Sequence, residues 1–160
     1  MPATDKKLRV LFLCTGNSAR SQIAEKLLNH KGSERFIAES AGSQPAQEVN
    51  PYAIEALERH GLQWTGGHPR HVDGLVSREW DFVITVCDRA KESCPIFPGQ
   101  PVTAHWGMPD PAAVTGPKSA KRRAFEDAVL VLSRRLDLLL ALPLEKLSKL
   151  SLQHALSQIS

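Results

Sequence analysis

The feature that most constrains the fold is a short apolar segment that runs directly into a loop of small residues and then into a helix. Residues 8–13 form a continuous apolar run with one arginine, which is typical of a strand buried on both faces of a parallel sheet. Residues 14–20 are mostly small or polar, and from Ser21 the apolar residues recur at helical spacing. This strand–loop–helix unit indicates an α/β fold.

Strand-like and helix-like segments alternate along the rest of the chain. Further strands are predicted to begin at Phe36 and end at residues 40–42, and to cover residues 82–86 and 102–106. Further helices are predicted over residues 51–60 and 120–142. Asn50 and Pro51 have the residue types of a helix cap and a first helical position. Residues 62–72 and 88–99 are predicted to be mostly loop. The alternation predicts a three-layer sandwich with a central parallel sheet flanked by helices.

The chain length fits one domain, with a separate tail. Of the 160 residues, we expect residues 8–142 to form a single catalytic domain and 143–160 to form a C-terminal helical extension. The leucines of the extension lie at roughly helical spacing. Amphipathic helices usually face a core, which favours packing on the domain over a dimer contact, so we expect a monomer or weak homodimer.

The composition limits the classes of partner. A hydrophobic content of 42% supports a sizeable core, and a net charge of +3 suits a small anionic substrate but is too weak to indicate nucleic-acid binding. No apolar run is long enough for an export signal or a membrane span, so we expect a cytoplasmic protein without a membrane partner. The three cysteines are therefore expected to be thiols rather than structural disulfides.

The loop after the first strand has the residues of an oxyanion site. Cys14 ends the strand, five residues separate it from Arg20, and the loop leads directly into a helix, so the backbone N–H groups of the loop can converge on an anion that the guanidinium clamps. We expect this field to lower the pKa of the Cys14 thiol, with a hydrogen bond from Ser18 or Ser21. The candidate oxyanion-binding residues are Thr15, Gly16, Asn17, Ser18, Ala19, Arg20 and Ser21. A buried structural cysteine is the alternative.

Two further thiols and one carboxylate complete the candidate residues. Cys87 ends a predicted strand and Cys94 follows on a polar loop, so the two thiols can form a redox pair. Inert thiols, or a zinc site with His105, are the alternatives, although the spacing is unlike common zinc patterns. Asp110 precedes a proline and is a candidate general acid, or simply a turn residue. We predict no metal site.

These motifs resemble those of one family. Residues 14–22 resemble the signature loop of the low-molecular-weight protein tyrosine phosphatase fold, which arsenate reductases share. The Cys87 and Cys94 pair is similar to that of the thioredoxin-coupled arsenate reductases, and residues 105–111 resemble the family's aspartate–proline segment. The resemblance covers about residues 8–142 and implies a low-molecular-weight phosphotyrosine phosphatase-like fold.

The resemblance implies a relay of three thiols. Cys14 would attack arsenate, Cys87 would then attack Cys14 and release arsenite, and Cys94 would form a disulfide with Cys87. No bound cofactor is implied, because an external dithiol reductant such as thioredoxin would restore the thiols. Arsenate is the implied substrate, and phosphate or sulfate would compete. A phosphotyrosine phosphatase, or a non-catalytic redox or oxyanion sensor, remains an alternative.

One position departs from the family pattern. Some members bind potassium near the signature loop, and the resemblance matches Asn17, Glu25 and Ser40 to its ligands. Where an aspartate is expected, the chain has Arg70, whose guanidinium would repel a cation and pair with Glu25. We therefore predict that activity does not require potassium.

Overall fold

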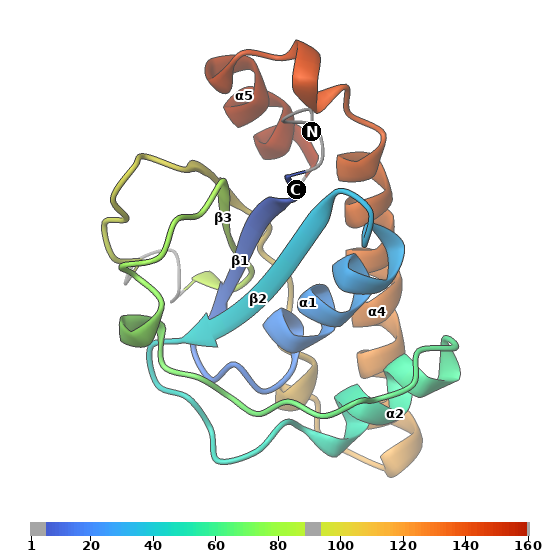
Figure 1. Cartoon of the computed structure of the whole chain (residues 1–160). Helices are drawn as coiled ribbons and strands as arrows, with labels where there is room; N and C mark the ends of the chain where they lie inside the picture. The colour runs from blue at the N-terminus through green and yellow to red at the C-terminus, as the bar shows by residue number, and fades with distance from the viewer. Residues whose placement is uncertain (1–5, 89–93, 160) are drawn as a thin grey trace.

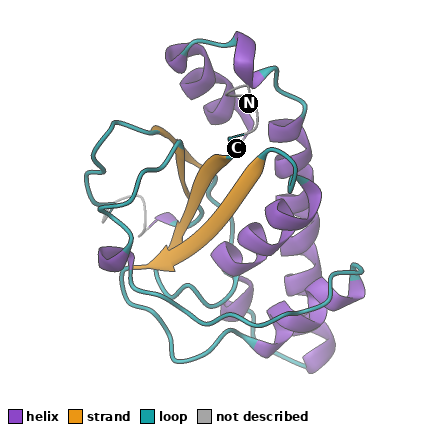
Figure 2. Ribbon diagram, in the orientation of Figure 1, coloured by secondary structure: helices purple, strands orange, loops and turns teal. Residues whose placement is uncertain are grey.

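The computed structural model describes residues 6–88 and 94–159. Its centre is a parallel sheet of four strands in the order β2-β1-β3-β4 (Figures 1 and 2). The strands are β1 (Leu8–Cys14), β2 (Phe36–Gly42), β3 (Phe82–Thr85) and β4 (Val102–His105). Helices flank this sheet, so the α/β fold predicted from the sequence is confirmed.

The register of the strands brings distant parts of the chain to one edge. Leu13 of β1 lies opposite Thr85 of β3, and Thr85 lies opposite His105 of β4. Cys14 at the end of β1 lies opposite Gly42 at the end of β2. The loops that follow all four strands therefore begin at the same carboxyl edge, which is where parallel α/β sheets bind ligands.

Helices α1 (Arg20–Lys31) and α2 (Pro51–Arg59) begin and end close to the predicted positions, and α4 (Lys118–Leu140) follows later in the chain. The backbone N–H of Gly32 closes α1 by donating to Leu28 O, and the Asn50 side chain caps α2 by accepting from the Tyr52 N–H at 2.9 Å. Helix α1 packs against β1 and β2, while α4 packs against α1 and α2.

The core forms around β1, whose residues from Val10 to Cys14 are buried. Phe12 contacts the fully buried Trp106, with ring centroids 6.4 Å apart. Burial of one such large apolar side chain contributes about 1.5–3 kcal/mol, so these contacts fix the strand that carries Cys14. The Arg9 guanidinium lies 5.2 Å from the ring centroid of Trp80, which also belongs to the core.

Helix α5 (Lys149–Ile159) lies against β4 and α4, and is preceded by the 3₁₀ turn η4 (Leu144–Lys146). Leu156 is fully buried, and its carbonyl accepts from the indole N–H of Trp106 at 3.0 Å. The side-chain amide of Gln153 pairs with both the backbone N–H and the carbonyl of Thr103 on the edge strand. The tail is thus tied to the sheet by apolar and polar contacts.

Some element bounds differ from the predicted ones by a few residues. β3 and β4 each end one residue earlier than predicted, and α4 runs from Lys118 to Leu140 rather than from 120 to 142. Two 3₁₀ turns, η2 (Val72–Gly74) and η3 (Pro111–Ala113), were not predicted. Residues 89–93 of the predicted polar loop lie outside the described residues. Within residues 6–88 and 94–159, no helix is long and apolar enough to cross a membrane.

Candidate active site

The loop from Cys14 to Arg20 joins the end of β1 to the first turn of α1. Asn17 is fully buried and has a φ of 51°, a left-handed conformation that asparagine tolerates better than most residues. Its amide nitrogen donates to Ser21 Oγ at 2.8 Å, and its Oδ1 accepts from the backbone N–H of Arg70 at 2.9 Å. The Asn17 side chain therefore holds the loop from beneath.

The end of β2 also packs closely beneath this loop. A Cβ atom on Gly42 would lie 2.3 Å from the backbone oxygen of Thr15, so any larger residue would displace the loop. The backbone N–H of Gln44 donates to Thr15 O, and that of Ala46 donates to Gly16 O, each at 2.9 Å. These contacts fix the backbone of the loop before any ligand binds.

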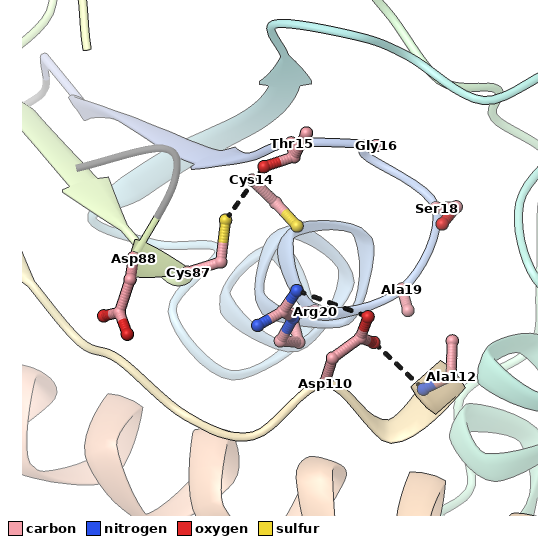
Figure 3. Close-up of a pocket in the computed structure, with 10 residues that line it drawn as sticks. All are labelled: Cys14, Thr15, Gly16, Ser18, Ala19, Arg20, Cys87, Asp88, Asp110 and Ala112. Atoms are coloured by element: carbon pink, nitrogen blue, oxygen red, sulfur yellow. Dashed lines mark hydrogen bonds and ion pairs between the residues drawn. The ribbon is translucent and has the colours of Figure 1, made fainter. Parts of the chain in front are cut away.

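The loop lines one side of a pocket of about 440 Å³ at the carboxyl edge of the sheet (Figure 3). The other side comes from the segments that follow β3 and β4. The residues that line the pocket are Cys14, Thr15, Gly16, Ser18, Ala19, Arg20, Cys87, Asp88, Asp110 and Ala112. Of the predicted oxyanion-binding residues, Asn17 and Ser21 do not line the pocket.

Asn17 and Ser21 have a different place from the one predicted for their side chains. Both side chains are fully buried and are hydrogen-bonded to each other, so they support the loop instead of facing an anion. The Ser21 hydroxyl accepts from Asn17, and among the described residues the hydrogen-bond partners of Cys14 do not include Ser18 or Ser21, so the predicted donation from one of these serines stays a prediction. The backbone N–H of Asn17 does interact with the Cys14 sulfur.

Arg20 faces the pocket and is anchored to the segment after β4. Its Nη1 donates to the carbonyl of Met108 at 3.0 Å, and its Nη2 lies 3.8 Å from Asp110 Oδ2. Within the part of the chain that the structure describes, its buried Nε has no hydrogen-bond partner. A buried donor without a partner is unfavourable, so this N–H favours the binding of an acceptor such as an oxyanion.

Asp110 lies at the rim of the same pocket. Its carboxylate caps η3 by accepting from the backbone N–H of Ala112 at 2.9 Å, and its other oxygen reaches Arg20. The side chain is 45% exposed. Asp110 can therefore contact both a ligand in the pocket and solvent.

Cys87 follows β3 and lies beside Cys14 (Figure 3). The Cys87 Sγ and Thr15 Oγ1 share a hydrogen bond of 3.4 Å, and the two thiols also interact by a side-chain hydrogen bond. Both thiols are buried and line the pocket. The sequence predicted a redox pair of Cys87 with Cys94, but the pairing with Thr15 was not predicted because it depends on the strand order.

The pKa of the Cys14 thiol is raised above its ordinary value. The hydrogen bond with Cys87 is the largest cause and burial is the second, whereas the charge of Arg20 and the backbone N–H of Asn17 lower it. The sequence prediction of a lowered pKa is therefore wrong in direction. That prediction included the effects of the loop backbone and of Arg20, but it did not include the effect of the Cys87 thiol on the pKa of Cys14.

Removing Cys87 should make Cys14 more reactive at neutral pH. Because the hydrogen bond with Cys87 raises the pKa of Cys14, the Cys87→Ala variant is expected to have a lower Cys14 pKa and more thiolate. The measurement is the rate of Cys14 alkylation by iodoacetamide as a function of pH, followed by peptide mass spectrometry. Cys94→Ala is the matched control and should leave the profile unchanged. A shift to higher pH in Cys87→Ala would mean that Cys87 instead donates to the Cys14 thiolate.

Cys94 lies apart from the other two thiols. It is partly buried and lines a second cavity of about 380 Å³ with residues of β3, β4 and α5. Burial raises the pKa of its thiol. Among the described residues, no group of three or more His, Cys, Asp or Glu side chains could hold a metal ion, and this includes the combination with His105.

Arg70 forms the ion pair that its sequence position suggested. Its guanidinium lies 3.6 Å from Glu25 Oε1 and 3.0 Å from Glu39 Oε1, while the Ser40 hydroxyl donates to Glu25 at 2.9 Å. A fixed positive charge therefore lies beside the carboxylate that would have to bind a cation.

Potassium should accordingly have little effect on this protein. We expect the activity in potassium chloride to differ from that in sodium chloride by less than about twofold, because Arg70 neutralises Glu25 and repels a cation. The comparison variant is Arg70→Gln, in which a potassium effect is expected to emerge. A large increase with potassium in the unsubstituted protein would contradict the prediction.

The fold and the pocket define a class of protein in which a cysteine nucleophile and an arginine share an oxyanion-binding loop after the first strand of a parallel sheet. Residues 9–153 match the model of the low molecular weight phosphotyrosine protein phosphatase family. The chain belongs to this family, as the resemblance in its sequence implied.

The relatives of the chain include arsenate reductases. One from Shouchella clausii is 37% identical over 119 residues, which cover 73% of this chain and 84% of the relative. The structure of an arsenate reductase from Archaeoglobus fulgidus is 30% identical, covers 80% of this chain and 98% of its own, and has a TM-score of 0.62. A thioredoxin-dependent arsenate reductase from Corynebacterium glutamicum is 28% identical, covers 85% and 65%, and has a TM-score of 0.60.

Proposed function

We propose that this protein is an arsenate reductase that converts arsenate to arsenite through its three thiols. The observation that carries the proposal is the second thiol, Cys87, which lies beside Cys14 inside the oxyanion pocket (Figure 3). A phosphatase needs one nucleophile in such a pocket. An adjacent thiol gives a covalent arsenic adduct a second reductant within reach, which is what a two-electron reduction requires.

The pocket favours a tetrahedral oxyanion. The unpartnered Nε of Arg20 and the backbone of the loop supply donors, and α1 begins at the pocket with its positive end. Phosphate and sulfate have the same shape and similar charge, so they compete with arsenate for binding. Selectivity for reduction then comes from the arsenic centre, which accepts electrons from thiols.

In the first step the Cys14 thiol gives up its proton toward an oxygen of the bound arsenate, its sulfur forms a bond to arsenic, and the bond from arsenic to that oxygen breaks, so the oxygen leaves as water. Asp110, which lies beside Arg20 at the rim of the pocket, is the group that protonates the leaving oxygen. Arg20 holds the remaining oxygens and stabilises the charge that develops on them.

In the second step the Cys87 sulfur attacks the Cys14 sulfur. A disulfide forms between them, the sulfur–arsenic bond breaks, and its electron pair remains on arsenic, which leaves as arsenite. Cys94 then attacks Cys87 and returns Cys14 to its thiolate form. The Cys87–Cys94 disulfide is reduced by an external dithiol protein, and the likeness to a thioredoxin-dependent arsenate reductase favours thioredoxin for this role.

The test is arsenate-dependent oxidation of NADPH in the presence of thioredoxin and thioredoxin reductase. Steady turnover that depends on both arsenate and thioredoxin would support the proposal. A protein that is inert in this assay but hydrolyses aryl phosphates through Cys14 is a phosphatase instead. If the protein binds arsenate but shows no turnover in either assay, it is a non-catalytic oxyanion sensor. Weak phosphatase activity beside arsenate reduction is expected, because both reactions begin at the same thiol.

A further inference from the structure

A chain of hydrogen bonds connects the two cavities that contain the thiols. Thr85 and His105 line the cavity of Cys94, whereas Asp88 lines the pocket of Cys14. The distance from Thr85 Oγ1 to His105 Nδ1 is 2.7 Å, and that from His105 Nε2 to Asp88 Oδ1 is 2.9 Å. The imidazole of His105 therefore bridges a hydroxyl in one cavity and a carboxylate in the other.

The chemistry of these groups fixes the direction of the hydrogen bonds. A carboxylate only accepts, so Nε2 of His105 carries the hydrogen that is donated to Asp88. In the neutral imidazole Nδ1 is then an acceptor, and the Thr85 hydroxyl donates to it. The hydroxyl's other contact, to Ala104 O, is much longer at 3.5 Å. The Cys94 thiol, which lines the same cavity, donates to the carbonyl of Pro95 at 3.6 Å, so it must turn away from that carbonyl to reach the lone pairs of the Thr85 oxygen.

The surroundings of His105 leave room for this pair. A Cβ atom on Gly107 would lie 2.7 Å from His105 Nε2 and 3.4 Å from Asp88 Oδ1, so a larger residue there would displace the imidazole or the carboxylate. Asp88 is the charged group in contact with His105 among the described residues. From α5, the uncharged Gln153 and Ser157 line the same cavity. From α4, Arg135 donates to the carbonyl of Trp106, the residue next to His105.

The last exchange between the thiols requires a base near Cys94. Cys94 must lose its proton before its sulfur attacks Cys87, because the thiolate is the nucleophile in disulfide exchange. Burial raises the pKa of this thiol, so few molecules are ionised at neutral pH. His105 lines the Cys94 cavity, and an imidazole is the side chain that most often serves as a general base in proteins, whereas a hydroxyl such as that of Thr85 can only pass a proton on.

We propose that His105, oriented by Asp88, takes up the Cys94 proton through the Thr85 hydroxyl during the final thiol exchange. This inference rests on the proposed reductase function and adds a positioning residue to it. His105 acts through Thr85 and Asp88, which distinguishes it from the three thiols that form bonds.

The Cys94 proton moves to the Thr85 oxygen while the Thr85 proton moves to His105 Nδ1, and Asp88 stabilises the imidazolium. The Cys94 sulfur forms a bond to the Cys87 sulfur, the bond between Cys87 and Cys14 breaks, and its electron pair remains on Cys14. Cys94 is thereby oxidised and Cys14 is reduced. The imidazolium later returns its proton to solvent through Asp88, whose side chain is 89% exposed.

The test is a single-turnover experiment with the whole chain and no reductant. Reduced protein is mixed with arsenate, quenched with acid at successive times and analysed by peptide mass spectrometry for the Cys14–Cys87 and Cys87–Cys94 disulfides. In His105→Gln, the Cys14–Cys87 disulfide is expected to accumulate and to decay about 10²-fold more slowly at neutral pH, as for loss of a general base. Raising the pH should restore the rate, because Cys94 then ionises without help.

The controls separate this role from a structural one. His154→Gln alters an exposed histidine on α5 and should keep the rate and pH profile of the unsubstituted protein. Asp88→Asn alters an exposed side chain in the same series of hydrogen bonds, so this variant decides the question if His105→Gln does not fold. In Asp88→Asn the decay of the Cys14–Cys87 disulfide should slow by about tenfold. If the Cys14–Cys87 disulfide decays at the unsubstituted rate and with an unchanged pH profile in a folded variant, the role of His105 is overturned while the proposed reductase function stands. If the unsubstituted protein forms no disulfide with arsenate, the proposed reductase function is overturned first, and the inference with it.

Discussion

Cys14→Ser is expected to abolish arsenate reduction, with a loss in turnover of more than about 10⁴-fold. The serine hydroxyl remains protonated at neutral pH, and an alcohol does not form the sulfur–arsenic bond on which the reduction depends. Aryl phosphate hydrolysis should be lost with it, because both reactions begin at this sulfur. The measurement is the thioredoxin-coupled assay, with p-nitrophenyl phosphate hydrolysis measured beside it.

Oxyanion binding should survive the same substitution. The donors of the pocket are the loop backbone and Arg20, which Cys14→Ser leaves in place. Phosphate is therefore expected to raise the melting temperature of the variant about as much as that of the unsubstituted protein, because a ligand stabilises the folded state that binds it. Reduction that persists in a correctly folded Cys14→Ser protein would show that another thiol is the nucleophile.

Cys94→Ser is expected to stop after one arsenite per chain. Cys14 and Cys87 lie together in one pocket and can complete the reduction of one arsenate, whereas Cys94 lies in another cavity and is needed only to free Cys14. Steady turnover should fall by more than about 10²-fold, because the buried Cys14–Cys87 disulfide is poorly accessible to a protein reductant. The measurement is arsenite released per chain, with and without thioredoxin.

Cys87→Ser provides the matched comparison for this result. This variant should release no arsenite, because no thiol then lies beside the Cys14 adduct to form the disulfide that releases arsenic. Full turnover in Cys94→Ser would contradict the three-thiol relay and would mean that the reductant attacks the Cys14–Cys87 disulfide directly.

Local sequence was sufficient for the features that depend on neighbours in the chain. The apolar run before Cys14, the small residues of the loop and the helical spacing after Arg20 predicted a strand, a turn and a helix in succession, and these elements are present. Asn50 and Pro51 predicted the start of α2 for the same reason, since capping depends on residues within one turn.

Features that depend on strand order could not be read in this way. Thr15 and Cys87 are 72 positions apart, and their contact exists because β3 pairs directly with β1. The same pairing reverses the predicted direction of the Cys14 pKa shift. The buried position of Ser21 was also missed, because the sequence does not indicate which face of the loop is covered by the segment that contains Arg70.

The bond between Gln153 and Thr103 has a consequence beyond holding the tail in place. β4 is an outer strand, and an outer strand presents N–H and C=O groups that can pair with a strand of another molecule. Gln153 occupies both groups of Thr103, and α5 covers the strand. We therefore expect a chain cut before Lys149 to associate edge to edge through β4, so the last helix keeps neighbouring copies from joining their sheets.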